Sequence, residues 1–313
     1  MFPYLNILGK QIPTYGICVL FGITFAALLV YFMTKKRKDF SKVHIINIPL
    51  FAAIGAFIGA HMVYGITRLD VAAYIFSHFQ DFTSSFGRGL ELMGLWIGGM
   101  VFYGGLLGAV IAAKMYCKSV KIDFSLYADI FAPAIPLFHA FGRLGCFLGG
   151  CCYGIESTWG VVYHSELNPD ANGVTRLPIQ LIEAGLNLLL MAVLILMSRK
   201  KFKKGTLLGV YFFAYAVIRF VDEFYRGDLI RGHLFGLSTS QWISIGVFVL
   251  GIVMILRRYV IPSTKNHFQP RVDTGLIPAG YFYNQYSGMI NAEQVQNIKY
   301  GTVEKSTLTV EED

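Results

Sequence analysis

The run YGICVLFGITFAALLVYFM, residues 15–33, contains nineteen residues and no charge. A helix needs about 20 consecutive apolar residues to cross the hydrocarbon core of a bilayer. The run is longer than the ~7–15-residue core of a cleavable signal peptide, and the nearest basic run follows it instead of preceding it. The stretch therefore predicts a first transmembrane helix, and the rest of the chain repeats its pattern.

Six further apolar segments follow, each close to the length of a membrane-spanning helix. They cover residues 43–66, 92–116, 124–148, 178–198, 206–224 and 241–256. Apolar residues run continuously through these segments, whereas transmembrane strands alternate apolar with polar residues. We predict an all-α, polytopic integral membrane protein with seven transmembrane helices, its N-terminus outside and its C-terminus cytoplasmic.

The composition agrees with a chain whose solvent is lipid. Of its 313 residues, 55% are hydrophobic and only 15% are charged, against about 25% charged residues in a soluble domain. This excludes a disordered chain and a disulfide-dense secreted module, and it disfavours a soluble enzyme. The net charge of +8 comes from short basic runs between apolar segments, so we expect no nucleic-acid partner.

The basic runs also predict the topology, because lysine and arginine accumulate in cytoplasmic loops. Lys35-Lys36-Arg37-Lys38 begins a basic-rich connection, and basic-rich and basic-poor connections then alternate along the chain. We predict a membrane domain over residues 1–261, with outside loops at 67–91 and 152–177, and a polar cytoplasmic tail over 262–313. Apolar residues at helical spacing predict an amphipathic helix on the outer leaflet within 67–91.

Two pairs of glycines have a spacing suited to helix packing. Gly55 and Gly59 are four residues apart, as are Gly104 and Gly108. Small residues at that spacing allow two helix backbones to approach closely in a membrane. We expect these glycines to pack helices together.

Ionisable residues within apolar segments are costly and mark functional sites or ion pairs. The segment 206–224 also contains Asp222. Tyr215, Arg219, Glu223 and Arg226 follow one another at spacings of four, four and three, which places them on one helical face. One interpretation is a buried Arg219–Glu223 ion pair that only fixes the orientation of the helix; the other is a binding site.

The end of the fourth segment, HAFGRLGCFLGGCCYG at residues 139–154, is unusually rich in glycine. It predicts a backbone that breaks its helix at membrane depth, which is tolerated only where it lines a cavity or is buried in protein. An arginine beside glycines, Arg143, predicts an anion site with open backbone N–H groups. Because Arg143 and Arg219 both lie near the outer surface in the predicted topology, the expected anion is a phospholipid phosphate.

The same stretch carries three of the five cysteines, Cys146, Cys151 and Cys152. A redox site, a metal site or a nucleophilic thiol activated by an arginine is one interpretation. The other is that they are small packing residues in a glycine-rich turn. Their spacing does not match the usual zinc pair, and adjacent cysteines pair with each other only under strain.

Taken together, these stretches resemble the signature of the prolipoprotein diacylglyceryl transferases. Gly142-Arg143-Leu144-Gly145 through Gly154 carries the resemblance, and matching pieces occur in the same order along residues 12–258. These pieces are Tyr15-Gly16, Gly98-Gly99-Met100, Tyr103-Gly104-Gly105-Leu106, Pro178-Ile179-Gln180-Leu181-Ile182-Glu183, Tyr215-Ala216-Val217-Ile218-Arg219-Phe220, Glu223, Arg226, Leu237-Ser238 and Gln241. The seven-span topology with the N-terminus outside is also that of the family.

The resemblance implies an enzyme that moves a diacylglyceryl group from phosphatidylglycerol to the lipobox cysteine of a secreted prolipoprotein. It implies a multi-pass protein of the bacterial cytoplasmic membrane that works in lipoprotein biosynthesis, and we expect no cofactor and no metal. The implied catalytic residues are Arg143, Arg219 and Tyr103. The implied substrate-binding residues are Tyr15, Gly142, Gly154, Gln180, Tyr215, Glu223 and Arg226.

Four positions depart from the family pattern. Tyr103 and Leu177 stand where histidine is usual, Cys146 where asparagine is usual, and Cys151 where glutamate is usual. A tyrosine, with a reference pKa near ~10, is a poor base at neutral pH but can hold a phosphate by a hydrogen bond. These departures leave two alternatives open, namely a non-catalytic protein that binds or transports a lipid or another anion, and a thiol-dependent enzyme on the same fold.

Overall fold

The computed structural model describes residues 1–260 apart from 8, 38, 84, 166–167 and 229–232. The predicted tail, 262–313, lies outside the described residues. The chain forms two compact units, Met1–Arg37 with Phe124–Ser263, and a second unit whose described part is Lys38–Asp123. The prediction of one membrane domain over residues 1–261 stays a prediction, and each unit is described by itself.

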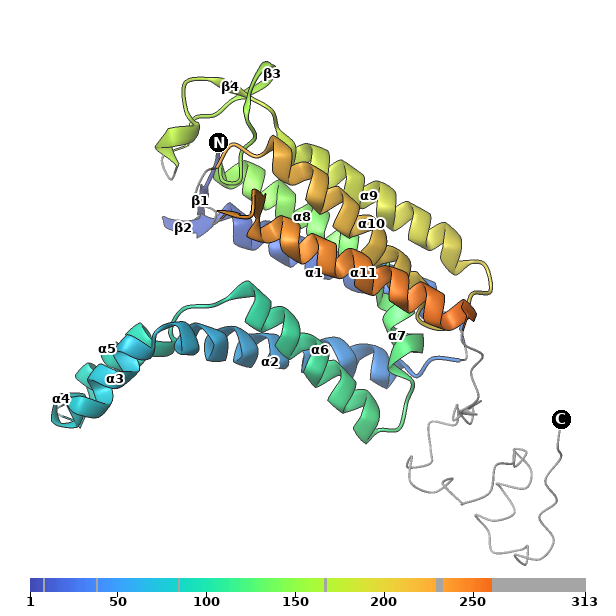
Figure 1. Ribbon diagram of the computed structural model, residues 1–313, viewed down its shortest axis with the longest axis horizontal. Coiled ribbons are helices and arrows are strands. Elements are labelled where there is room, and N and C mark those ends of the chain that lie inside the picture. The colour runs from blue at the N-terminus through green and yellow to red at the C-terminus, as the bar shows by residue number, and fades with distance from the viewer. Residues whose placement is uncertain (8, 38, 84, 166–167, 229–232, 261–313) are drawn as a thin grey trace, which may run out of the picture. The chain divides into compact units, whose positions relative to one another are not determined.

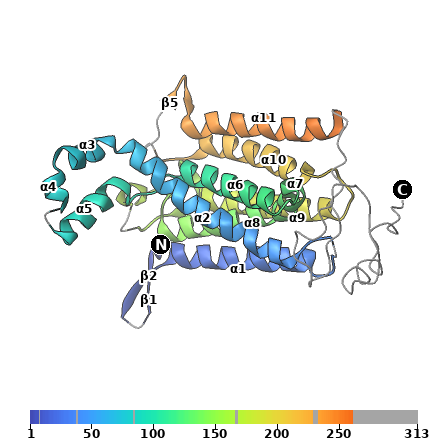
Figure 2. The ribbon, with the colours of Figure 1, turned by 90° about the horizontal axis from the view of Figure 1, so that it is seen from below.

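The first unit is a layer of long helices (Figure 1). Its helices are α1 (Thr14–Thr34), α7 (Phe124–Phe131), α8 (Ala134–Gly149), α9 (Ile179–Ser198), α10 (Thr206–Asp222) and α11 (Thr239–Val260). Neighbours pack in the order α1, α8, α9, α10, α11, and Figure 2 shows α1 and α11 on opposite sides of this unit. The short α7 packs at one end against α8, α10 and α1.

The core of this unit lies between α7, α9 and α10. Seven buried residues form it: Ala128, Ala132, Leu190, Leu194, Leu207, Leu208 and Tyr211. The outward faces are apolar as well, since Leu20 on α1 is 66% exposed and Leu189 on α9 is 62% exposed. Helices that are hydrophobic all round, yet leave large apolar side chains uncovered, suit a lipid environment.

Side chains cap the N-terminal ends of two helices of the first unit, α10 and α11. The Asp129 carboxylate of α7 accepts hydrogen bonds from the backbone N–H groups of Gly205 (2.6 Å) and Leu208 (3.0 Å) at the start of α10. At the start of α11, Ser238 N–H donates to the Gln241 side chain at 2.9 Å, and Gln241 N–H donates to the Ser238 hydroxyl at 3.2 Å. Asp129, Ser238 and Gln241 therefore hold helix ends in place.

The second unit is built on a close pair of helices, α2 (Lys42–Thr67) and α6 (Phe102–Ser119). Between them in sequence lie three short helices, α3 (Leu69–Ser77), α4 (Phe79–Thr83) and α5 (Phe86–Ile97). A Cβ atom on Gly59 would collide with the Gly104 carbonyl oxygen, and one on Gly108 would collide with that of Gly55. The predicted packing role of these four glycines is confirmed.

Four described helices, α1, α2, α9 and α11, are long and apolar enough to cross a membrane, and the pair α7–α8 makes a fifth candidate bent by 42°. The bend lies at Ala132-Pro133, because proline lacks the N–H that would continue the helix. The predicted spans 92–116 and 206–224 are not among these candidates. The coarse prediction of a helical membrane protein is confirmed, while the count of seven spans is a proposal taken up below.

The two remaining segments differ from simple spans for local reasons. The segment 92–116 is interrupted between α5 and α6, where Val101 N–H donates to the Ala60 carbonyl at 3.1 Å and a Cβ on Gly99 would collide with the Tyr64 ring. The segment 206–224 is α-helical over only the 17 residues of α10, about 26 Å of rise. The loop 67–91 is helical as predicted, but it forms α3, α4 and the first part of α5 instead of one helix.

Three small antiparallel hairpins, which the sequence analysis did not predict, accompany the helices. They pair β1 (Tyr4–Ile7) with β2 (Lys10–Pro13), β3 (Glu156–Val162) with β4 (Thr175–Arg176), and β5 (His233–Leu234) with β6 (Leu237–Ser238). The β3–β4 hairpin occupies most of the predicted outside loop 152–177.

We predict that Gly59→Leu separates α2 from α6, because the new side chain has no room against the α6 backbone. Overpacking of this kind costs about 1–3 kcal/mol or more, so the midpoint of thermal unfolding in detergent falls. Gly94→Ala on α5 is the matched control, since a Cβ there meets nothing within 4 Å. Equal midpoints for Gly59→Leu and Gly94→Ala would contradict the packing role.

Candidate active site

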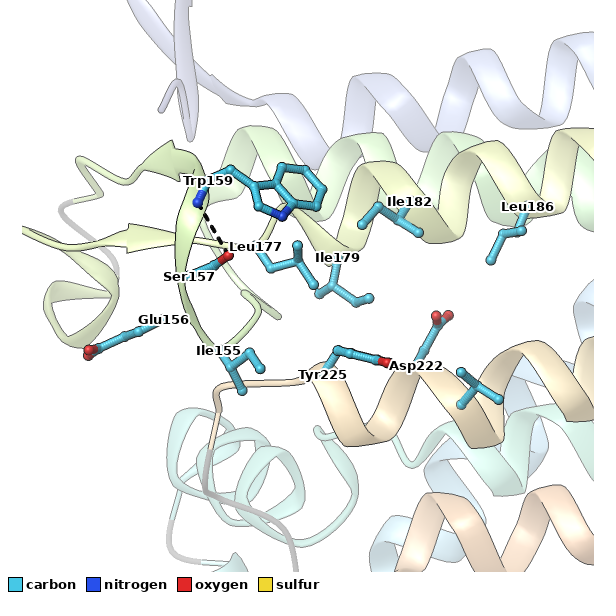
Figure 3. A pocket seen from close by; sticks show the side chains of 11 residues that line it. Ile155, Glu156, Ser157, Trp159, Leu177, Ile179, Ile182, Leu186, Asp222 and Tyr225 are labelled. Carbon is cyan, nitrogen blue, oxygen red and sulfur yellow. Dashed lines mark hydrogen bonds between the residues drawn. The ribbon is translucent and has the colours of Figure 1, made fainter.

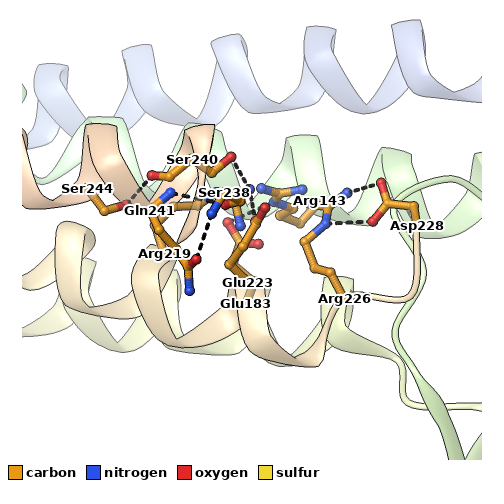
Figure 4. Close-up of polar contacts among 10 residues, drawn as sticks. All are labelled: Arg143, Glu183, Arg219, Glu223, Arg226, Asp228, Ser238, Ser240, Gln241 and Ser244. Atoms are coloured by element: carbon orange, nitrogen blue, oxygen red, sulfur yellow. Dashed lines mark hydrogen bonds and ion pairs between the residues drawn. The ribbon is translucent and has the colours of Figure 1, made fainter. Parts of the chain in front are cut away.

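Arg143 forms an ion pair within the first unit (Figure 4). Its Nε lies 2.8 Å from Oε1 of Glu183, which is 2% exposed on α9. A buried charge is tolerated only with a close partner, and this one joins α8 to α9. Glu183 was quoted as part of the family-like motif but was not predicted as a partner of Arg143.

Arg219 forms a second ion pair on α10. Its Nη2 lies 2.7 Å from Oε2 of Glu223 and donates to the Ser240 hydroxyl at 3.1 Å. The predicted Arg219–Glu223 ion pair is therefore confirmed. The other terminal nitrogen, Nη1, is buried and has no hydrogen-bond partner among the described residues.

A third carboxyl group, that of Asp222, interacts electrostatically with both arginines. Asp222 is 3% exposed and lies next to Glu183, with Arg219 and Arg143 as its cationic neighbours. Its Oδ2 is buried and has no hydrogen-bond partner within the described part of the chain. The sequence analysis noted Asp222 as a charge and gave it no role. The sequence contained a signal for such a role: the segment 206–224 has two acidic residues, Asp222 and Glu223, and one arginine can neutralise only one of them.

Tyr215 completes this group from one turn before Arg219. Its nearest charged groups are Glu183, Arg143, Arg219 and Asp222. Its ring lies 4.9 Å from the His139 ring, centroid to centroid. Tyr215 thus interacts electrostatically with both arginines, and each arginine pairs with a glutamate.

Arg226 does not share the helical face predicted for it. α10 ends at Asp222, a short 3-10 turn follows over Glu223–Tyr225, and Arg226 has an extended backbone. Its guanidinium donates two hydrogen bonds, at 2.8 and 2.6 Å, to the Asp228 carboxylate. Burial alone would lower the pKa of Arg226, but the hydrogen bond and charge of Asp228 outweigh it and raise the pKa, so the side chain stays cationic.

The predicted helix break falls inside the glycine-rich stretch, at its C-terminal end after Gly149. α8 continues through Gly142 and Gly145 to Gly149, and the chain reverses at Gly150, whose φ is +70°. The N–H groups beside Arg143 are therefore committed to intrahelical hydrogen bonds, and no open anion-binding backbone forms there. Gly145 instead makes room for Tyr15, whose ring atom Cδ2 lies 2.9 Å from the position of a Cβ on Gly145.

The three cysteines meet at the end of α8. The sulfur atoms of Cys146, Cys151 and Cys152 all lie within 4.8 Å of one another, and all three side chains are half-buried. Cys151 N–H donates to the Cys146 carbonyl at 3.0 Å, which turns the chain back over the helix end. The structure records no disulfide among them.

Gln180 and Gly154 hold this turn in place. The Gln180 side chain, 1% exposed, donates to the Cys151 carbonyl and accepts from the Tyr163 hydroxyl, both at 2.8 Å. Gly154 pairs with Arg226 in an isolated β-bridge, and a Cβ on it would collide with the Leu177 carbonyl. Both residues were predicted to bind substrate, which stays a prediction; their observed contacts are with the protein itself.

An apolar cavity of about 420 Å³ opens between α9, α10 and the β3–β4 hairpin (Figure 3). Its wall contains Ile179, Ile182, Leu186, Val221 and Trp159, with Asp222 as a buried charged group. In Figure 3 the Asp222 carboxylate points from α10 toward α9. The cavity places an apolar surface beside the arginine–carboxylate group.

Two predicted site residues lie at more exposed positions. Tyr15 on α1 is 49% exposed, and its ring lies close to Gly145 on α8. Tyr103 is on α6 in the second unit and is 44% exposed. Its predicted role in holding the phosphate or the incoming thiol stays a prediction.

These features define a class: helical membrane proteins with paired arginines and buried carboxylates beside an apolar cavity. Comparison with known proteins narrows the class. The family model described as prolipoprotein diacylglyceryl transferase matches residues 3–257, and the chain belongs to this family.

Relatives in several bacteria agree. The chain is 32% identical to the phosphatidylglycerol–prolipoprotein diacylglyceryl transferase of Clostridium tetani, over 79% of this chain and 93% of that protein. Identity to the protein of the same name from Idiomarina loihiensis is 32%, over 79% of this chain and 88% of that protein. The Campylobacter jejuni protein is 30% identical, over 80% of this chain and 91% of its own length.

We predict that Gln180→Ala destabilises the fold, because it leaves the Tyr163 hydroxyl and the Cys151 carbonyl without their partner. Each buried polar group left unpaired costs about 1–3 kcal/mol, so the midpoint of thermal unfolding in detergent falls. Tyr163→Phe removes the hydroxyl that donates to Gln180 and leaves only the Gln180 oxygen without a donor, so it should lower the unfolding midpoint less than Gln180→Ala does. If Gln180→Ala kept the midpoint and only weakened substrate binding, the structural role would be wrong.

Proposed function

We propose that this chain transfers a diacylglyceryl group from phosphatidylglycerol to the thiol of a prolipoprotein cysteine. The observation that carries the proposal is the pair of half-buried arginines on α8 and α10, one of which keeps a buried, unpartnered N–H, next to an apolar cavity. Membership in the family and the substrates in the names of its relatives support it.

The reaction forms one bond and breaks one. The thiol sulfur attacks the glyceryl carbon of the lipid, a C–S thioether bond forms, and the C–O bond to the phosphate breaks, so glycerol phosphate leaves. Negative charge accumulates on the phosphate oxygens, and the guanidinium groups of Arg143 and Arg219 stabilise it. We assign the thiol proton to the unpartnered Oδ2 of Asp222, a carboxyl already surrounded by both arginines.

The cavity supplies the apolar part of the site. Its aliphatic lining from α9 and α10 matches an acyl chain, and the Asp222 carboxyl is part of its wall. A phospholipid bound this way places its tails against Ile182 and Leu186 and its phosphate toward the arginines. Glu156 and Ser157 of β3 add polar groups to the cavity wall, and β3 lies in the loop that the proposed topology places outside, where a secreted peptide would arrive.

We predict that Arg143→Ala and Arg219→Ala each lower kcat by about 10²–10³-fold, the usual cost of one lost charge-stabilising donor. The assay uses purified protein in phosphatidylglycerol vesicles and follows lipid transfer to a lipobox peptide. Complementation of a bacterium depleted of its own diacylglyceryl transferase gives the same test in cells. Arg88→Ala, on an exposed helix of the second unit, is the control and should leave the rate unchanged.

Removal of one member of a buried ion pair can also unfold a protein, at a cost of about 3–5 kcal/mol. The double variant Arg143→Met, Glu183→Leu removes both charges and leaves no unpaired one. It should fold and remain inactive. A folded double variant with full activity would refute the electrostatic role, and binding of phosphatidylglycerol without any transfer by the wild type would indicate a non-catalytic lipid-binding protein.

We further propose that Tyr103 holds the phosphate or the incoming thiol by a hydrogen bond and does not act as a base. Tyr103→Phe should then lower the rate about tenfold, equivalent to the ~1–1.5 kcal/mol of one neutral hydrogen bond. Tyr103→His should raise the rate, which climbs as pH passes ~6.5 because the neutral imidazole accepts the thiol proton. No change in Tyr103→Phe, together with loss of activity in Cys151→Ser, would instead favour a thiol-dependent reaction.

We propose seven spans in the bacterial cytoplasmic membrane, with α6 and α10 added to the five candidates, the N-terminus outside and the tail 262–313 cytoplasmic. The alternation of basic loops supports this topology. A tag inserted at 172–173 should react with an impermeant reagent on intact spheroplasts, whereas a tag after residue 313 should react only after lysis. The reverse pattern would overturn the orientation and the outer-leaflet site.

A further inference from the structure

The cysteine cluster is a set of three sulfur ligands that the proposed reaction does not use. Cys146 comes from the last turn of α8, and Cys151 and Cys152 come from the turn that follows it. Their sulfur atoms lie within 4.8 Å of one another. This is the only group of three or more histidine, cysteine or acidic residues with such spacing in the part of the chain that the structure describes.

The backbone is held in a shape that gathers the sulfurs. Gly150 has a φ of +70°, and a side chain there would meet Ser165 at 2.6 Å, so the reversal needs glycine. Cys152 has a φ of +59°, a conformation that a residue with a Cβ seldom adopts. Cys151 is held on both sides, because its N–H donates to the Cys146 carbonyl and its carbonyl accepts from the Gln180 side chain. The backbone conformation of Cys152 is therefore energetically unfavourable, and the surrounding contacts keep it beside Cys146 and Cys151.

The donor set selects the kind of ligand. Three thiolates without oxygen or imidazole favour soft ions such as Cu⁺ and Zn²⁺ over Mg²⁺ or Ca²⁺. With metal–sulfur bonds of about 2.3 Å, three sulfurs around one ion lie roughly 4 Å apart. The observed upper limit of 4.8 Å is within a small side-chain adjustment of that geometry.

Charge around the cluster suits deprotonated sulfur. The Arg226 guanidinium, while paired with Asp228, also interacts with the Cys152 side chain. Arg143 lies one helical turn before Cys146 on α8 and is another neighbouring cation. Partial exposure of all three cysteines leaves a route for an ion to enter.

We propose that Cys146, Cys151 and Cys152 bind one soft d¹⁰ metal ion, Cu⁺ or Zn²⁺, in a three-thiolate site at the C-terminal end of α8. Three metal–sulfur bonds form, three thiol protons pass to solvent, and no electron is transferred. The proposal does not rest on the transferase activity. Sequence spacing alone led us to expect no metal. The turn at Gly150 changes this expectation, because it brings Cys151 and Cys152 back to Cys146, which lies five residues before Cys151 in the chain.

The test uses the full chain, purified in detergent without oxygen, then equilibrated with Zn²⁺, Cu⁺ or Mg²⁺ and freed of excess ion. Elemental analysis should find about one Zn²⁺ or Cu⁺ and no Mg²⁺ per chain. Cys146→Ser, Cys151→Ser and Cys152→Ser should each weaken binding by more than the ~10–100-fold cost of losing an outer-shell partner. Cys18→Ser is the matched control and should bind as the wild type does.

A second measurement covers variants that fail to fold. Alkylation of the native wild-type chain, followed by mass spectrometry, should show that Zn²⁺ or Cu⁺ protects the three cluster cysteines together while labelling of Cys18 is unchanged. When Zn²⁺ and Cu⁺ are added together, the ion that remains bound is the one that the site prefers. Equal binding by the cluster variants and the wild type, labelling that the ions do not change, or a disulfide within the cluster of the protein purified without oxygen would overturn the proposal.

Discussion

Pairing of charge inside an apolar bundle is the constraint on which the first unit depends. Arg143 with Glu183 and Arg219 with Glu223 are ion pairs among helices whose outer faces are apolar. An isolated charge in such surroundings is costly, while a close pair with its hydrogen bonds is tolerated. The Arg143–Glu183 pair crosses from α8 to α9, so it fixes how these two helices face each other.

The pairing is not complete, and the incomplete part lies where function is proposed. Asp222 adds a third carboxyl to two arginines, and both Asp222 Oδ2 and Arg219 Nη1 are buried without a partner among the described residues. Buried polar atoms normally have partners, and exceptions need an explanation such as a ligand or a catalytic role. A phosphate near Arg219 and a transferred proton on Asp222 would satisfy these two atoms in the proposed reaction.

One short stretch of chain serves both the arginine group and the cysteine cluster. α8 presents Arg143 to α9, continues for two turns, and ends in the reversal at Gly150 that gathers the cysteines. Gln180, at the start of α9, holds that reversal through the Cys151 carbonyl, and Glu183 on the same helix holds Arg143. The first two turns of α9 therefore position both groups, through the buried polar residues Gln180 and Glu183.

The sequence by itself determined the helical membrane class, the glycine-mediated contact of α2 with α6, and the Arg219–Glu223 pair, because each follows from local composition or from spacing along one helix. Only the tertiary structure decided which carboxyl pairs with Arg143, where Asp222 lies, and that Arg226 pairs with Asp228. These depend on contacts between helices or on where a helix ends, and neither is encoded in helical periodicity. The glycine stretch shows the limit most directly. Its glycines predicted a helix break within the stretch and open N–H groups beside Arg143. In α8, however, Gly145 serves helix packing and Gly150 serves the chain reversal, and only Gly150 ends the helix.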